Sequence, residues 1–207
     1  MHVWFLISVL GLIAVSPLHF LSVEHLRLQK KYGKEKGTKI GETLGLVSGW
    51  TFFVFWLGIW FSPQPRFNVP IPHNLNVRIF NLSIPILHLV IFLLLFLLGA
   101  WLGIEGVKRT TLRVAEIHRT ERVVTDGVYS TVRHPQYLGG LLAHTGFSFL
   151  LSGWYSLLSL PLAALLVYLI SRKEEEELVR EFGKQYEDYK KEVPMFMPKL
   201  KKSREHA

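Results

Sequence analysis

The chain of 207 residues is long enough for one domain with a substantial core, and no shift in composition divides it into two. It contains no cysteine, which excludes disulfides, thiolate catalysis and cysteine-based metal sites. Apolar residues make up 49% of the chain and are gathered in blocks, and the formal net charge is +8, so a membrane protein with basic loops is expected.

Five apolar segments predict an all-α, multi-pass membrane protein with about five transmembrane helices. Residues 1–20, 44–61 and 82–104 are nearly or fully uncharged, and each approaches the ~20 residues that cross a bilayer. Residues 138–151 and 155–170 are shorter and lie close together, so we expect a tight helical hairpin that spans incompletely or thins the bilayer locally. A signal peptide is the alternative for the first segment, but the lack of a basic n-region and of a cleavage site favours a retained helix.

All 24 Lys and Arg residues lie outside these segments. Six lie within residues 24–42, two within 62–81, six within 107–137 and ten after residue 170. If every segment crosses, the three rich groups share one side. The positive-inside rule then places the N-terminus outside and the C-terminus in the cytoplasm, at the cell membrane or the endoplasmic reticulum depending on the organism. The basic charge is explained by topology and anionic lipid headgroups, so no nucleic-acid partner is predicted.

Two connections have distinctive compositions. Residues 32–43, with Gly33, Gly37 and Gly41 among lysines, are expected to form a flexible cytoplasmic loop. Residues 62–72 contain four prolines, which exclude a helix and predict an external loop.

The chain after the fifth segment has the pattern of an amphipathic helix. Within residues 171–194 apolar side chains recur at helical intervals, and acidic residues lie at the start and basic residues at the end. We therefore predict a cytosolic helix that runs directly out of the last membrane segment and ends at Pro194.

The sequence RHPQYLGG, residues 133–140, precedes the fourth apolar segment. Pro135 restricts His134 to extended conformations and itself suits the first position of a helix, so the fourth helix is predicted to begin here. The unpaired N–H groups of that helix end would bind an anion beside Arg133 and His134, with the Tyr137 ring facing an aromatic base. The alternative is that Arg133 reaches lipid headgroups and Tyr137 belongs to the interfacial aromatic belt.

The sequence GVYSTVRHPQYLGG, followed some 30 residues later by EEEEL and then by FGKQYEDYKKEVP, resembles the integral-membrane methyltransferases of the isoprenylcysteine carboxyl methyltransferase and phospholipid methyltransferase group. The resemblance covers residues 99–198 of a single domain, between an N-terminal membrane part (1–98) and a basic tail (199–207). Enzymes of this group bind S-adenosylmethionine without a Rossmann domain, and this chain has no GxGxxG between a strand and a helix.

The resemblance implies a cofactor site made by the motif and the acidic tail. The implied cofactor-binding residues are His118, Tyr129, His134, Pro135, Gln136, Tyr137, Glu174 and Glu175, with Gly99, Ala100 and Trp101 in the preceding helix. Gly99 and Gly103 also have the GxxxG spacing of closely packed membrane helices. The histidines form no HExxH or clustered pattern, so no metal is predicted.

The implied reaction is methyl transfer from S-adenosylmethionine to a lipophilic acceptor, and the implied partners are a lipid or a prenylated small molecule or protein, together with membrane lipids. A prenylcysteine carboxylate needs an arginine to orient it, for which Arg133 and Arg172 are the candidates. A phospholipid headgroup amine needs a carboxylate to take its proton, for which Glu175 and Glu105 are the candidates.

Two other classes of function stay open. Membrane sterol and steroid reductases have a similar RHPNYxGE element and use a nicotinamide cofactor, but here Gln136 and Gly140 replace the asparagine and the glutamate. A membrane scaffold without catalytic activity would use the same residues only to anchor itself in headgroups.

Overall fold

The computed structural model describes residues 3–69, 75–79, 82–110 and 122–199. Four helical stretches in it are long and apolar enough to cross a membrane: α1 (Val3–Val23), α3 (Lys34–Phe61), α4 (Ile86–Thr110), and Trp154–Phe182, which comprises α7 (Trp154–Leu158) and α8 (Leu160–Phe182). Their outward faces are apolar, as at Leu94 and Leu97 of α4, which are 65% and 61% exposed. Such faces require lipid rather than water around them, so the chain is an all-α integral membrane protein.

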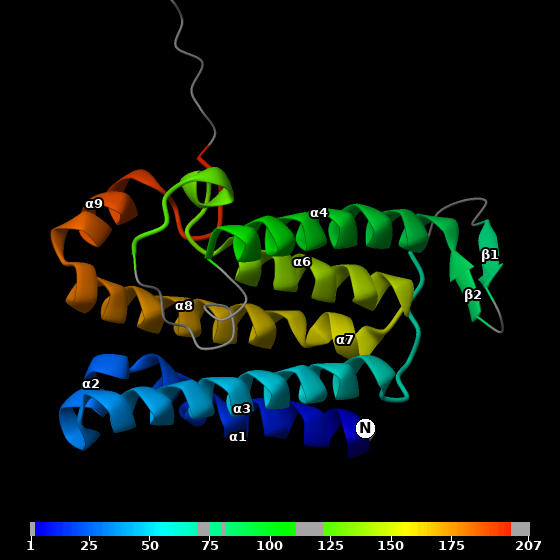
Figure 1. The fold of residues 1–207 in the computed structure, drawn as a ribbon. Helices are drawn as coiled ribbons and strands as arrows, with labels where there is room; N and C mark the ends of the chain where they lie inside the picture. The colour runs from blue at the N-terminus through cyan, green and yellow to red at the C-terminus, as the bar shows by residue number, and fades with distance from the viewer. Residues whose placement is uncertain (1–2, 70–74, 80–81, 111–121, 200–207) are drawn as a thin grey trace, which may run out of the picture.

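The helices form two antiparallel pairs with α8 between them (Figure 1). One pair is α1 and α3, and the other is α4 and α6 (Pro135–Leu150). The predicted hairpin is confirmed, because α6 ends at Leu150 and α7 begins at Trp154. At ~1.5 Å per residue α6 is only ~24 Å long, so a fifth crossing by α6 stays a prediction.

The prediction of a flexible loop at residues 32–43 is wrong, because this segment is helical apart from Gly33. α2 (His25–Tyr32) and α3 are separated by Gly33 alone, whose φ of 84° lies in the left-handed region that favours glycine. Gly37 lies against α2, where an added Cβ would be 2.5 Å from the backbone of Leu28 and Gln29. The glycines here permit a close helix contact, which the sequence pattern does not distinguish from loop flexibility.

The apolar run at residues 82–104 does not begin as a helix. β2 (Leu82–Pro85) pairs antiparallel with β1 (Asn76–Ile79), with Val77 opposite Ile84, and α4 starts only at Ile86. Pro85 disfavours helical conformation in the residue before it, which fits a strand there. Residues 62–69 are not helical, as predicted, and this segment lies on the α6–α7 turn, where Phe67 donates its N–H to the Ser152 carbonyl at 2.8 Å.

The tail is not one continuous helix. α8 ends at Phe182, and Gly183, with φ 55° and ψ −130°, separates it from α9 (Lys184–Glu192). The break turns α9 back over the end of the bundle, where Tyr186, Tyr189 and Val193 form a buried cluster. The chain after α9 is thereby brought to the start of α6 (Figure 1).

The N-terminal helices are tied to the same end of α8 by buried carboxylates. Lys173 Nζ lies 2.5 Å from Glu24 Oε1, and the backbone N–H of Leu26 donates to Glu177 Oε1 at 2.6 Å. Glu24 and Glu177 are 9% and 5% exposed. These contacts hold residues 174–177 of α8, which we call the acidic stretch, in a fixed place between the two halves of the chain.

Candidate functional site

The start of α6 has the predicted geometry. His134 is not helical (φ −125°, ψ 63°) and Pro135 is the first residue of the helix, preceded by the short helix η1 (Gly127–Ser130). The backbone N–H groups of Arg133 and His134, however, donate to the carbonyls of Pro194 and Met195 at 3.0 and 3.2 Å. The tail therefore uses two of the donors nearest to the expected anion position.

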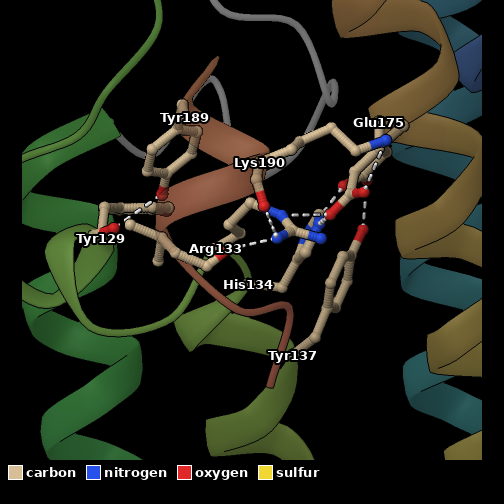
Figure 2. A network of polar contacts seen from close by, with 9 residues as sticks. Tyr129, Arg133, His134, Tyr137, Glu175, Tyr189 and Lys190 are labelled. Atoms are coloured by element: carbon tan, nitrogen blue, oxygen red, sulfur yellow. Dashed lines mark hydrogen bonds and ion pairs between the residues drawn. The ribbon is translucent and has the colours of Figure 1, made fainter. Parts of the chain in front are cut away.

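Arg133 is a buried link between the motif and the tail (Figure 2). Its Nε donates to Glu175 Oε1 at 2.7 Å, and its Nη1 donates to the carbonyls of Lys190, at 3.1 Å, and Val193. Its side chain is 9% exposed. These guanidinium donors are used within the protein, and because Arg133 also lines the cavity described below, its role in orienting a substrate carboxylate stays a prediction.

Glu175 is the anionic centre of the network. Besides Arg133, it faces His134 Nε2 at 3.1 Å from its Oε1 and Lys190 Nζ at 3.2 Å from its Oε2, and its side chain is 3% exposed. A buried carboxylate surrounded by three cationic or polar nitrogens is stabilised by them and holds them in place. Glu175 thus joins α8, α6 and α9 (Figure 2), whereas the cavity beside it is lined by Glu174.

Glu174 is the carboxylate that reaches the cavity. It accepts a hydrogen bond from the Tyr137 hydroxyl, and its Oε2 lies 3.6 Å from His134 Nδ1. The rings of His134 and Tyr137 are stacked with centroids 5.8 Å apart. The motif and the acidic stretch, some 40 residues apart in sequence, therefore meet as predicted.

A cavity of about 130 Å³ lies over this contact. It is lined by Thr110, Arg122, Val123, Val124, Tyr129, Arg133, His134, Gln136, Tyr137, Glu174, Leu178, Tyr186 and Tyr189. Pockets that enclose a drug-sized ligand measure roughly 300–1,000 Å³, so the described residues form the floor of a site and do not enclose one.

Besides Tyr137, three further tyrosines line this cavity: Tyr129, Tyr186 and Tyr189. Gln136 Nε2 donates to the Tyr129 hydroxyl and to Thr110 Oγ1, each at 3.1 Å, and the Tyr189 hydroxyl donates to the Tyr129 carbonyl at 2.7 Å. Burial raises the pKa of Tyr129, Tyr186 and Tyr189, so all three phenols stay neutral. Tyr186 and Tyr189 were not predicted for the site, because their helical spacing indicates only that they are buried.

The other predicted residues lie elsewhere. The Arg172 side chain is 63% exposed, with its Nε 3.7 Å from Glu176 Oε1, and it lines neither cavity. Gly99 packs on α6, where an added Cβ would lie 2.5 Å from the Gly139 carbonyl oxygen. Trp101 is 53% exposed on α4, and Ala100 beside it lines neither cavity.

Two candidates remain to be placed. Glu105 pairs with Lys108 at 2.7 Å near the end of α4, an ordinary ion pair of successive helical turns. His118 lies outside the described residues.

A second, apolar cavity of about 590 Å³ lies among α1, α3, α6 and α8, and we call it the apolar groove. It is lined by His19, Gly45, Leu46, Gly49, Trp50, Phe52, Phe53, Trp56, Gln136, Tyr137, Gly140, Leu141, Ala163, Leu166, Val167 and Ile170. Gln136 and Tyr137 line both cavities. The first turn of α6 therefore lies between the apolar groove and the first cavity, which we call the polar floor. The sequence signal for the groove is a set of glycines in apolar segments, which also fits plain helix packing.

Sequence comparisons with known proteins find methyltransferases. Residues 87–185 match the family described as phospholipid methyltransferase. The protein-S-isoprenylcysteine O-methyltransferase of Schizosaccharomyces pombe is 42% identical over 78 residues, which are 37% of this chain and 33% of that protein. The protein of the same name from Homo sapiens is 37% identical over 84 residues, covering 40% and 29%.

A relative with a different acceptor is also similar. The methanethiol S-methyltransferase 2 of Bradyrhizobium diazoefficiens is 40% identical over 73 residues, covering 35% of this chain and 27% of that protein. The similarity to each of these three relatives thus extends over a third or less of the relative's length. The family match includes the motif and the acidic stretch that meet in the structure. Residues 87–185 of the chain thus match the phospholipid methyltransferase family, and the chain is similar over 73 to 84 residues to the three methyltransferases named above.

Proposed function

We propose that the chain is an S-adenosylmethionine-dependent methyltransferase that methylates a lipophilic acceptor, in the manner of an isoprenylcysteine carboxyl O-methyltransferase. The observation that carries the proposal is that the polar floor and the apolar groove share Gln136 and Tyr137. The methyl donor would bind on the polar floor and the lipophilic acceptor in the apolar groove, and their reacting groups would meet beside these two residues.

The donor set of the polar floor suits S-adenosylmethionine. Glu174 offers a carboxylate to an ammonium or to ribose hydroxyls, and the neutral tyrosine rings offer faces to adenine. His134 and Gln136 add hydrogen-bonding groups. When bound, the cofactor would supply a methyl group on a positively charged sulfur, so the leaving group needs no acid.

The residues of this chain would act by positioning and by excluding water. In the proposed step the acceptor would use its lone pair to take the methyl group, and the electron pair of the broken carbon–sulfur bond would stay on the sulfur. The Tyr137 hydroxyl would hold Glu174 in the orientation that faces the donor, and the apolar residues of the groove would keep water from the acceptor.

The groove favours an acceptor with a hydrocarbon chain over a small one. Trp50 and Phe53 at its lip are 60% and 49% exposed, so a lipid could enter sideways from the bilayer. The names of the relatives from yeast and human support a prenylated cysteine as this acceptor. The phospholipid amine is the second candidate, supported by the family match.

We further propose that the end of the bundle that carries the polar floor faces the cytoplasm, because the basic loops gather there.

The test is to incubate the purified full chain in detergent with methyl-labelled S-adenosylmethionine and three acceptor groups: prenylcysteine analogues, phospholipids and small thiols. We expect label in the prenylcysteine fraction as a base-labile ester. Label in phospholipid amines instead would select the second candidate. Label in no fraction, with no binding of S-adenosylhomocysteine, would reject the proposed function.

A further inference from the structure

The apolar groove has a defined length. Along α3 its lining residues run from Gly45 to Trp56, a distance of ~16 Å at ~1.5 Å per residue. The hydrocarbon core of a bilayer is ~30 Å thick, so the groove extends from the site to about the middle of the membrane.

Trp56 is the last residue of α3 that lines the groove, and its ring is packed against neighbouring helices. Its ring packs on His144, with centroids 5.0 Å apart, and it contacts the buried cluster of Leu12, Ile59 and Leu166. His144 is fully buried and accepts the Trp60 Nε1–H at its Nδ1, at 2.9 Å. Because that donor fixes the tautomer, His144 Nε2 carries the proton and donates to the Ser156 carbonyl at 3.0 Å.

Two glycines leave the other end of the groove wide. Gly49 of α3 and Gly140 of α6 both line it, and a Cβ added at either would meet no atom within 4 Å. Gly37, Gly99 and Gly139 differ, since an added Cβ there would lie 2.5 Å from backbone atoms of a neighbouring helix. Helix packing therefore does not require Gly49 and Gly140, whereas open space in the groove does.

We infer that the groove measures the length of the hydrocarbon chain of the methyl acceptor. Trp56 would stop the end of that chain, and Gly49 and Gly140 would keep the groove wide enough for it beside Tyr137. This inference rests on the proposed function for the identity of the occupant. The chain enters past the exposed Trp50 and Phe53, runs along α3, and ends on the Trp56 ring. A longer chain then leaves its acceptor group displaced from the polar floor.

The test uses N-acetyl-S-geranyl, S-farnesyl and S-geranylgeranyl cysteine as probes on the full chain in detergent with S-adenosylhomocysteine present. Binding is measured as thermal stabilisation, and methyl transfer is measured separately with S-adenosylmethionine. In Trp56→Leu, which keeps an apolar side chain against the core, we expect the ratio of geranylgeranyl to farnesyl affinity to rise about tenfold over the wild-type ratio. Trp56→Ala, the larger deletion, should move the ratio in the same direction.

A matched pair of glycine variants tests the width. Gly140→Leu should weaken binding of all three probes at least about tenfold. Gly103→Leu, also within a helix and with no atom within 4 Å of an added Cβ but outside the groove, should leave binding within about twofold of wild type. Equal effects of the two variants, an unchanged chain-length ratio in both Trp56 variants, or no stabilisation of the wild type by any probe would each overturn the inference. A shifted binding ratio without methyl transfer would keep the measurement of chain length and reject the acceptor class.

Discussion

Replacing Glu175 by glutamine should lower the free energy of unfolding by roughly 3 kcal/mol, because it leaves the buried Arg133 guanidinium without its anion. Arg133, His134 and Lys190 all face this carboxylate, which is 3% exposed. With the charge removed, the repulsion between the Arg133 guanidinium and the Lys190 ammonium is no longer balanced by a carboxylate between them. The tail should then separate from the start of α6.

Two measurements check this expectation. Denaturant titration in detergent gives the change in stability, and amide hydrogen exchange over residues 184–195 reports whether the tail has undocked. Glu176→Gln is the matched control, because Glu176 is 46% exposed and pairs with the exposed Arg172, and its replacement should change stability by less than ~0.5 kcal/mol. A Glu175→Gln protein that folds as wild type does and loses only cofactor affinity would make Glu175 a ligand contact instead of a structural anchor.

Replacing Glu174 by glutamine should weaken cofactor binding and leave the fold intact, whereas Glu175→Gln should mainly lower stability. The side chain lines the polar floor, and the amide oxygen can still accept the Tyr137 hydroxyl, so the fold should be retained. A hydrogen bond to a charged group contributes about 1.5–3 kcal/mol, so we expect the affinity for S-adenosylhomocysteine to fall by roughly 10- to 100-fold.

Isothermal titration calorimetry with S-adenosylhomocysteine measures this effect directly. Glu176→Gln again serves as the control, because Glu176 lies two residues further along α8 and outside the cavity. Affinity that is unchanged in Glu174→Gln would remove Glu174 from the cofactor site. A loss of stability equal to that of Glu175→Gln would assign the pair a common structural role.

The sequence predicts the helical membrane class and the meeting of the motif with the acidic stretch. Long uncharged runs leave few alternatives in lipid, where backbone groups must be paired within the segment. The restriction that Pro135 places on His134 is likewise a local steric effect, so the start of α6 was predicted at the correct residue.

Features that depend on tertiary contacts were missed. Glu174 and Glu175 differ by one step around α8, and only the placement of the helix decides which faces the cavity and which faces Arg133. Gly37 packs on α2 and Gly183 breaks the tail helix, although the sequence around Gly37 is that of a flexible loop and the sequence around Gly183 is that of a continuous helix. The sequence alone does not distinguish a glycine that permits a close helix contact from one that breaks a helix.

The most direct test of the account is an experimental structure of the full chain with S-adenosylhomocysteine bound. We expect the ligand on the polar floor, in contact with Tyr137 and Glu174, with its sulfur directed past Gln136 toward the apolar groove. A ligand bound elsewhere, or a sulfur separated from the groove by intact protein, would contradict the claim that one turn of α6 brings the methyl donor and the lipid acceptor together.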